Sequence, residues 1–151
     1  MLPDDYLELA TQLAVAGATR PKQALLRRAV STAYYALFHH AARTMADALI
    51  GRQAGASKSA PWIQMYRALE HRRARDVCAS FALVSQFPDG IREFANMFMT
   101  LQDKRHAADY KPNLVLSKSA VLQDVRSGAN ALRAYNAESM KERQSFNVLF
   151  L

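Results

Sequence analysis

Residues 21–50 read PKQALLRRAVSTAYYALFHHAARTMADALI, and after Pro21 they contain neither proline nor glycine. Apolar side chains recur every three or four residues in this stretch, which is the period of an α-helix. The stretch predicts one helix, about 45 Å long, with Thr19 as its N-cap and Gly51 at its end. Because the apolar positions cover more than one side, we expect this helix to lie at the centre of a bundle.

The segments on either side of this long helix predict further helices. A helix is expected over about residues 4–16, with Pro3 in its first turn and Gly17 at its end. Residues 51–60 are small and polar and predict a loop. Ser59 is then expected to cap a third helix. The apolar positions of that helix are Trp62, Ile63, Tyr66, Leu69, Val77, Cys78, Phe81 and Leu83.

The last third of the chain predicts two more helices and a tail. The turn sequence Phe-Pro-Asp-Gly at 87–90 precedes a fourth helix over about 91–109. Ser117 is expected to cap a fifth helix over about 118–137. The tail, residues 138–151, is assigned to no element, and its apolar side chains need burial either on this bundle or on a second subunit.

The length of 151 residues suits a single domain, with its core over about residues 4–137. Only five glycines and five prolines interrupt the chain, which favours a few long helices over many short strands. We therefore predict an all-α fold, an antiparallel up-and-down bundle of four to five helices.

Composition also indicates where the protein works. Cys78 is the only cysteine, so it is expected to be a small buried residue in a reducing compartment. Asp4 and Asp5 argue against a signal peptide, and no apolar stretch approaches the roughly 20 residues of a membrane span. We expect a cytoplasmic protein that does not enter a membrane. The net charge of +7 suits a nucleic-acid partner and equally suits an ordinary solvated surface.

Motifs for cofactors and metals are missing from the sequence. No glycine-rich phosphate loop occurs, and no Cys/His spacing matches a metal site. His39 and His40 are adjacent, so on a helix they point about 100° apart and do not form a metal-binding pair. We therefore predict no metal and no cofactor.

One candidate site lies on the long helix. Arg28, Ser31, Tyr35 and His39 share a helical face. An arginine near a helical core needs a carboxylate or phosphate partner. Two interpretations stay open: Arg28 or Arg27 pairs with an internal aspartate, or this face binds a phosphate.

A second candidate lies at the end of the fourth helix. Arg105 and Asp109 are four residues apart and can form an ion pair, and His106 can pair with Tyr110. This arrangement is either a structural latch or a site where Arg105 binds phosphate while His106 or Tyr110 moves protons. The basic run at 71–75, His-Arg-Arg-Ala-Arg, is either a solvated face or a nucleic-acid contact.

With these motifs the chain resembles the HEPN family (higher eukaryotes and prokaryotes nucleotide-binding). The resemblance rests on Asp5–Ala10, on Arg27–His39, on the pattern Arg105-x-x-Ala108-Asp109-Tyr110, and on an alanine-rich closing helix. It implies an antiparallel bundle of four or five helices and a homodimer with the arginine segments near the interface. Many relatives are metal-independent endoribonucleases, often toxins beside a nucleotidyltransferase antitoxin.

The chain departs from the ribonuclease branch of that family at one position. The family motif places a histidine four to six residues after the arginine, but here position 110 is tyrosine and position 111 is lysine. We therefore expect binding of RNA or a nucleotide phosphate in a toxin–antitoxin or defence pair. Arg105, Asp109, Arg28, Tyr35 and His39 would bind the phosphate. The alternatives are a metal-independent endoribonuclease toxin that uses Arg105 with His106 or Tyr110, and a non-catalytic protein-interaction module.

Overall fold

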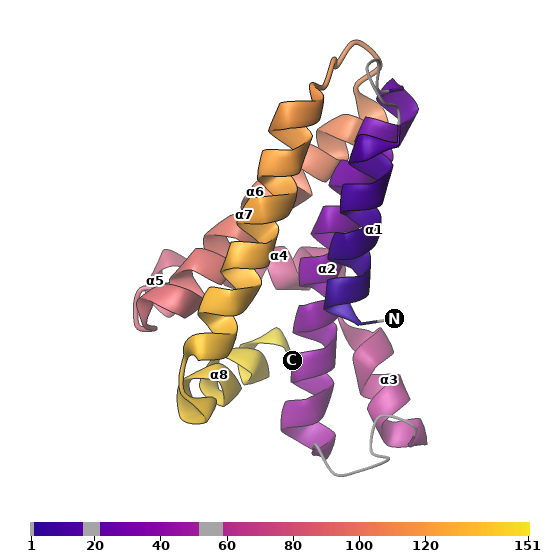
Figure 1. Cartoon of the computed structure of the whole chain (residues 1–151). Helices are drawn as coiled ribbons and strands as arrows, with labels where there is room; N and C mark the ends of the chain where they lie inside the picture. Colours follow the sequence, from indigo (N-terminus) through magenta and orange to yellow (C-terminus); the bar gives the residue numbers. More distant parts are fainter. Residues whose placement is uncertain (1, 17–21, 52–58) are drawn as a thin grey trace.

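The computed structural model of the chain describes residues 2–16, 22–51 and 59–151. These residues form eight α-helices and one short 3₁₀ helix, and within them no strand occurs (Figure 1). The predicted all-α class is therefore confirmed, whereas the count of four to five helices is wrong. The elements are α1 (Pro3–Val15), α2 (Gln23–Ile50), α3 (Ala60–Ala68), α4 (His71–Ala79), α5 (Phe81–Val84), α6 (Asp89–Tyr110), α7 (Lys118–Ala137), α8 (Met140–Asn147) and η2 (Val148–Phe150).

The predicted long helix is α2, and it lies at the centre of the fold. It packs against α1, α3, α6 and α7, and the four longest helices run alternately up and down in Figure 1. Small side chains let the neighbouring helices approach α2 closely. The fully or almost fully buried alanines of this helix are Ala29, Ala33, Ala36, Ala41, Ala42 and Ala46. The expected N-cap, Thr19, lies outside the described residues, as do Gly17 and most of the predicted loop.

The predicted caps of two helices are confirmed. The Ser59 hydroxyl accepts a hydrogen bond from the Trp62 amide at the start of α3, over 3.3 Å. The Ser117 hydroxyl accepts one from the Ala120 amide at the start of α7, over 3.2 Å. Each serine satisfies an amide that has no partner inside its helix.

The prediction of a single third helix is wrong, because the chain forms three separate helices there. The backbone is extended at Leu69 and Glu70, between α3 and α4, and again at Ser80, between α4 and α5. Leu69 is buried at the first break, and the Ser80 side chain caps α5 at the second. Phe81, which the helical pattern places in the core, is 85% exposed as a result.

The tail packs on the bundle of its own chain. Phe146 and Phe150 are buried, and the Phe146 ring lies 5.4 Å from the ring of Phe87 and 6.4 Å from that of Phe94, measured between centroids. Of the two alternatives for the tail, burial on the same chain is correct for these two residues. Val148 remains partly exposed.

Cys78 is buried with 2% of its surface exposed, as predicted. Burial raises the pKa of its thiol to about 12, and the nearby Arg75 only partly opposes this shift. The thiol therefore stays protonated at neutral pH. Separately, none of the helices in the described ranges is both long and apolar enough to serve as a transmembrane segment.

Candidate functional site

Arg105 lies on the face of α6 that packs against α2, and it is held from three sides. Its Nε lies 3.2 Å from the Asp109 carboxylate, so the predicted ion pair is confirmed. Its guanidinium carbon lies 5.6 Å from the ring centroids of both Tyr34 and Tyr35. Ser31 in turn donates a 2.8 Å hydrogen bond to Asp109. Only 20% of the Arg105 side chain is exposed, so its position is well defined.

The terminal nitrogens of Arg105 remain available to a ligand. Among the residues that the structure describes, Nη1 and Nη2 have no hydrogen-bond acceptor, and the side chain keeps 20% of its surface exposed. Arginine presents these two donors in a planar fork that matches a phosphate or a carboxylate. A mostly buried arginine with its fork open is therefore suited to binding an oxyanion.

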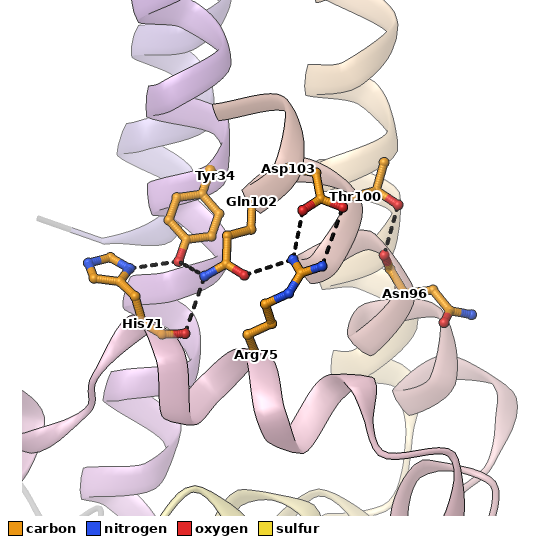
Figure 2. Close-up of polar contacts among 7 residues, drawn as sticks. All are labelled: Tyr34, His71, Arg75, Asn96, Thr100, Gln102 and Asp103. Atoms are coloured by element: carbon orange, nitrogen blue, oxygen red, sulfur yellow. Dashed lines mark hydrogen bonds and ion pairs between the residues drawn. The ribbon is translucent and has the colours of Figure 1, made fainter. Parts of the chain in front are cut away.

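A chain of polar contacts leads from α6 to His71, the first residue of α4 (Figure 2). Arg75 forms an ion pair with Asp103 at 2.9 Å and donates to the Gln102 amide oxygen at 3.0 Å. The Gln102 amide nitrogen donates to the Tyr34 hydroxyl and to the His71 carbonyl, both at 3.2 Å. The hydroxyl oxygen of Tyr34 and Nδ1 of His71 then lie 2.7 Å apart. The network connects α2, α4 and α6 beside Arg105.

Burial shifts the pKa values of Tyr34 and His71, the last two residues of this network. It raises the pKa of Tyr34 well above its ordinary value, against the smaller opposing effects of Gln102 and Arg105. It also lowers the pKa of His71 below 6.5, and the positive charge of Arg105 lowers it further. At neutral pH the tyrosine is therefore protonated and His71 is neutral.

His39 lies in an aromatic stack beside the Arg105 cluster. Its ring stacks on Tyr6 of α1 at 4.7 Å between centroids, and its Nδ1 shares a hydrogen bond with the hydroxyl of Tyr66 in α3. Tyr66 stacks in turn on Trp62, at 5.2 Å. Burial is the main cause that lowers the pKa of His39. His39 therefore joins three helices, and its Nδ1 is used internally.

Arg27 and Arg28 of α2 make different contacts from the internal ion pair that the sequence suggests. Neither forms an ion pair with an internal aspartate in the described residues. Arg27 donates to backbone carbonyls at the end of α6 and beyond, at 2.6 Å to Ala108, 2.9 Å to Lys111 and 2.6 Å to Leu114. These carbonyls lack helical partners, and the guanidinium satisfies them. Arg28 is exposed and takes no part in the contacts around Arg105.

His106 and Tyr110 pack against each other, as predicted, with ring centroids 4.8 Å apart. Both are exposed, and in the described residues neither side chain forms a hydrogen bond, ion pair or ring contact with Arg105, Tyr34 or Tyr35. The helical rotation of about 100° per residue turns His106 away from the inward face of Arg105. Of the residues predicted from the sequence, the structure thus brings together Ser31, Tyr35, Arg105 and Asp109, with His39 adjacent.

His71 and Gln102 are the site residues that sequence reasoning missed. The sequence presents His71 only as part of a basic run, although it lies four residues before Arg75 and so shares a helical face with it. Gln102 lies three residues before Arg105 on α6. These spacings could have indicated which residues share a helical face. They indicate a shared site only if one knows that the chain breaks at Leu69 and Glu70, before α4.

Comparison with known proteins gives no further guide to this site. The chain matches no family model, no curated protein and no solved structure. The HEPN resemblance therefore stays a prediction. In the described part of the chain, no group of three or more His, Cys, Asp and Glu side chains is arranged to hold a metal ion.

Proposed function

We propose that this protein binds a phosphate group of RNA or of a nucleotide at Arg105. The observation that carries the proposal is the open fork of Arg105, whose stem is fixed by Asp109 and by the rings of Tyr34 and Tyr35. A fixed guanidinium loses little entropy on binding an oxyanion. Tyr35 is half-buried beside it and offers an aromatic surface to a base.

The charge of the chain favours a phosphate over a neutral ligand. The net charge is +7, and a basic protein attracts polyanions and releases their counterions on binding. RNA or a nucleotide combines such a charge with a base that can stack on tyrosine.

Binding without cleavage suits the residues around Arg105 better than ribonuclease chemistry. Cleavage through the 2′-hydroxyl needs groups that take up and release protons near pH 7. The raised pKa of Tyr34 makes it a poor base, and in the described residues the side chains of His106 and Tyr110 form no hydrogen bond or ring contact with that of Arg105. The metal-independent endoribonuclease is therefore the alternative that the experiment must exclude.

The finer parts of the proposal rest on the HEPN resemblance. They are a HEPN-like bundle built on α1, α2, α6 and α7, a homodimer, a nucleotidyltransferase-type antitoxin partner and a cytoplasmic toxin–antitoxin or defence role. Size-exclusion chromatography with light scattering tests the dimer directly. A monomer at all accessible concentrations would contradict that part of the proposal while leaving phosphate binding at Arg105 intact.

The test of the proposal is equilibrium binding of a labelled single-stranded RNA, with and without a metal chelator. Arg105→Gln should weaken binding roughly tenfold or more, because it removes a charged, two-pronged contact. Arg126→Gln is the matched control, since Arg126 is exposed on α7 and, among the described residues, donates a side-chain hydrogen bond only to Gln123. Equal binding by both variants would contradict the proposal. Metal-independent cutting that Arg105→Gln abolishes would favour the ribonuclease.

A further inference from the structure

We infer that His71 is a second phosphate-binding residue of this site, which donates a hydrogen bond from Nε2 to the same group that Arg105 holds. The inference rests on the proposed function and adds to it a neutral donor from a different helix. The position of the His71 proton also decides whether this residue can act as a base.

His71 and Arg105 lie against the same two tyrosines. The His71 ring centroid is 5.7 Å from that of Tyr34 and 6.1 Å from that of Tyr35. The guanidinium carbon of Arg105 is 5.6 Å from each of these rings. Arg105 is also close enough to affect the protonation of His71. A ligand bound at Arg105 is therefore a near neighbour of the imidazole.

The polar network assigns every proton between Asp103 and His71 (Figure 2). Arg75 can only donate, so the Gln102 atom facing it is the amide oxygen. The Gln102 nitrogen then donates to the Tyr34 hydroxyl and the His71 carbonyl. Since Tyr34 is fully buried, its own hydrogen needs an acceptor, and His71 Nδ1 is the one within reach in the described residues.

This assignment places the proton of neutral His71 on Nε2. In Figure 2 that nitrogen lies on the side of the ring that points away from Tyr34. Nε2 has no hydrogen-bond partner among the described residues, and His71 is only half-buried. Phe38 stacks on the ring at 4.0 Å and so fixes its plane. The result is a rigid N–H donor directed outwards.

The neutral state of His71 also follows from its surroundings. The charged and titratable groups near it are Arg105 from α6, Arg75 from its own helix, and Tyr34, Tyr35 and His39 from α2. Arg75 is paired with Asp103 and Arg105 with Asp109, and no carboxylate forms an ion pair with His71 in the described residues. Protonation would also deprive the buried Tyr34 hydroxyl of its acceptor. His71 therefore binds phosphate as a neutral donor, and its open nitrogen has no free lone pair with which to act as a base.

Two substitutions separate the two nitrogens of His71. His71→Asn keeps an oxygen near the position of Nδ1 to accept from Tyr34, but it has no donor at the position of Nε2. His71→Gln has a donor near the position of Nε2, but it has no acceptor near the position of Nδ1. With a labelled single-stranded RNA, whose diester phosphates do not titrate near neutral pH, His71→Asn should weaken binding roughly tenfold. His71→Gln should remain within about threefold of the wild type.

Nitrogen NMR of the wild-type protein provides a measurement that needs no variant. The inference predicts that the free protein carries the His71 proton on Nε2, and that the Nε2 signal shifts when RNA is added. It also predicts an affinity that is flat from about pH 7 to about pH 8, because no protonation of His71 is needed. A proton on Nδ1, or an affinity that falls about tenfold over that range, would overturn the inference.

The outcomes also distinguish the inference from the proposed function. If Arg105→Gln weakens binding while His71→Asn binds like the wild type, His71 is not a ligand and the proposed function stands. If His71→Asn weakens binding while Arg105→Gln does not, the proposed function fails at Arg105. If RNA does not bind the wild-type protein, both are wrong.

Discussion

Arg105 Nε and Asp109 Oδ2 lie 3.2 Å apart across one turn of α6, while Ser31 of α2 donates to the other oxygen of the same carboxylate. The aspartate therefore contacts both helices and orients the arginine without occupying its terminal nitrogens. The rings of Tyr34 and Tyr35 complete the support of the guanidinium. A charge held in this way remains available to a ligand.

Asp109→Asn should change the free energy of unfolding by less than about 1 kcal/mol, because a partly exposed ion pair contributes little to stability. The carboxylate is 33% exposed, and the asparagine oxygen can still accept from Ser31. Urea denaturation of the two proteins provides the measurement. A loss of several kcal/mol would show that the pair is a structural latch, contrary to this account.

Arg27→Ala should destabilise the protein by about 2–3 kcal/mol, because it removes charged hydrogen bonds to carbonyls that have no helical partner. Arg28→Ala is the matched control on the adjacent residue and should stay within about 0.5 kcal/mol of the wild type, because Arg28 is exposed. Both values can be read from urea denaturation. Equal effects of the two substitutions would contradict the role assigned to Arg27.

Gly90→Ala should destabilise the protein by about 2–3 kcal/mol, because a Cβ there would lie 2.3 Å from the Ala134 carbonyl oxygen. That backbone oxygen cannot move aside easily. At Gly128 a Cβ would meet the ends of three leucine side chains, Leu101 at 3.3 Å, Leu37 at 3.4 Å and Leu7 at 3.8 Å. Gly128→Ala should therefore stay within about 1 kcal/mol of the wild type, since improved helix propensity offsets the tighter packing. Thermal unfolding of both variants tests this contrast.

Stability should fall as the pH drops below about 6.5. Burial lowers the pKa of both His39 and His71 in the folded protein, so the unfolded chain binds more protons in this range. The stabilisation is fully present above the unfolded value of about 6.5 and is lost as the pH falls towards the lower folded values. The slope of unfolding free energy against pH should be smaller in His71→Asn. An unchanged slope in that variant would contradict the shift at His71.

Much of the framework of the fold could be predicted from the sequence. The Ser117 cap and the spacing of apolar residues predict α7 at its observed bounds, and the turn sequence at 87–90 with the apolar spacing predicts α6 to within two residues. The four-residue spacing of Arg105 and Asp109 likewise predicted their ion pair. These features depend on neighbours along one helix, so local sequence is sufficient to predict them.

The rest depends on contacts between distant segments. No glycine or proline marks the break at Leu69 and Glu70, where burial of Leu69 accompanies the change of direction. That break places His71 against Tyr34, 37 residues earlier in the chain. Arg27 reaches carbonyls more than 80 residues away. Helical periodicity contains no information about such pairs, and the site around Arg105 was therefore predicted without His71.

The salt dependence of RNA binding tests the central claim most directly, because each phosphate contact contributes to the slope of log Kd against log salt. Loss of one contact with single-stranded RNA should reduce that slope by about 0.7. We predict this reduction for Arg105→Gln, with no change for Arg126→Gln. Arg105→Lys should retain the slope but bind more weakly, because it keeps the charge and loses the planar fork. An identical slope and affinity in the wild type and Arg105→Gln would contradict phosphate binding at Arg105.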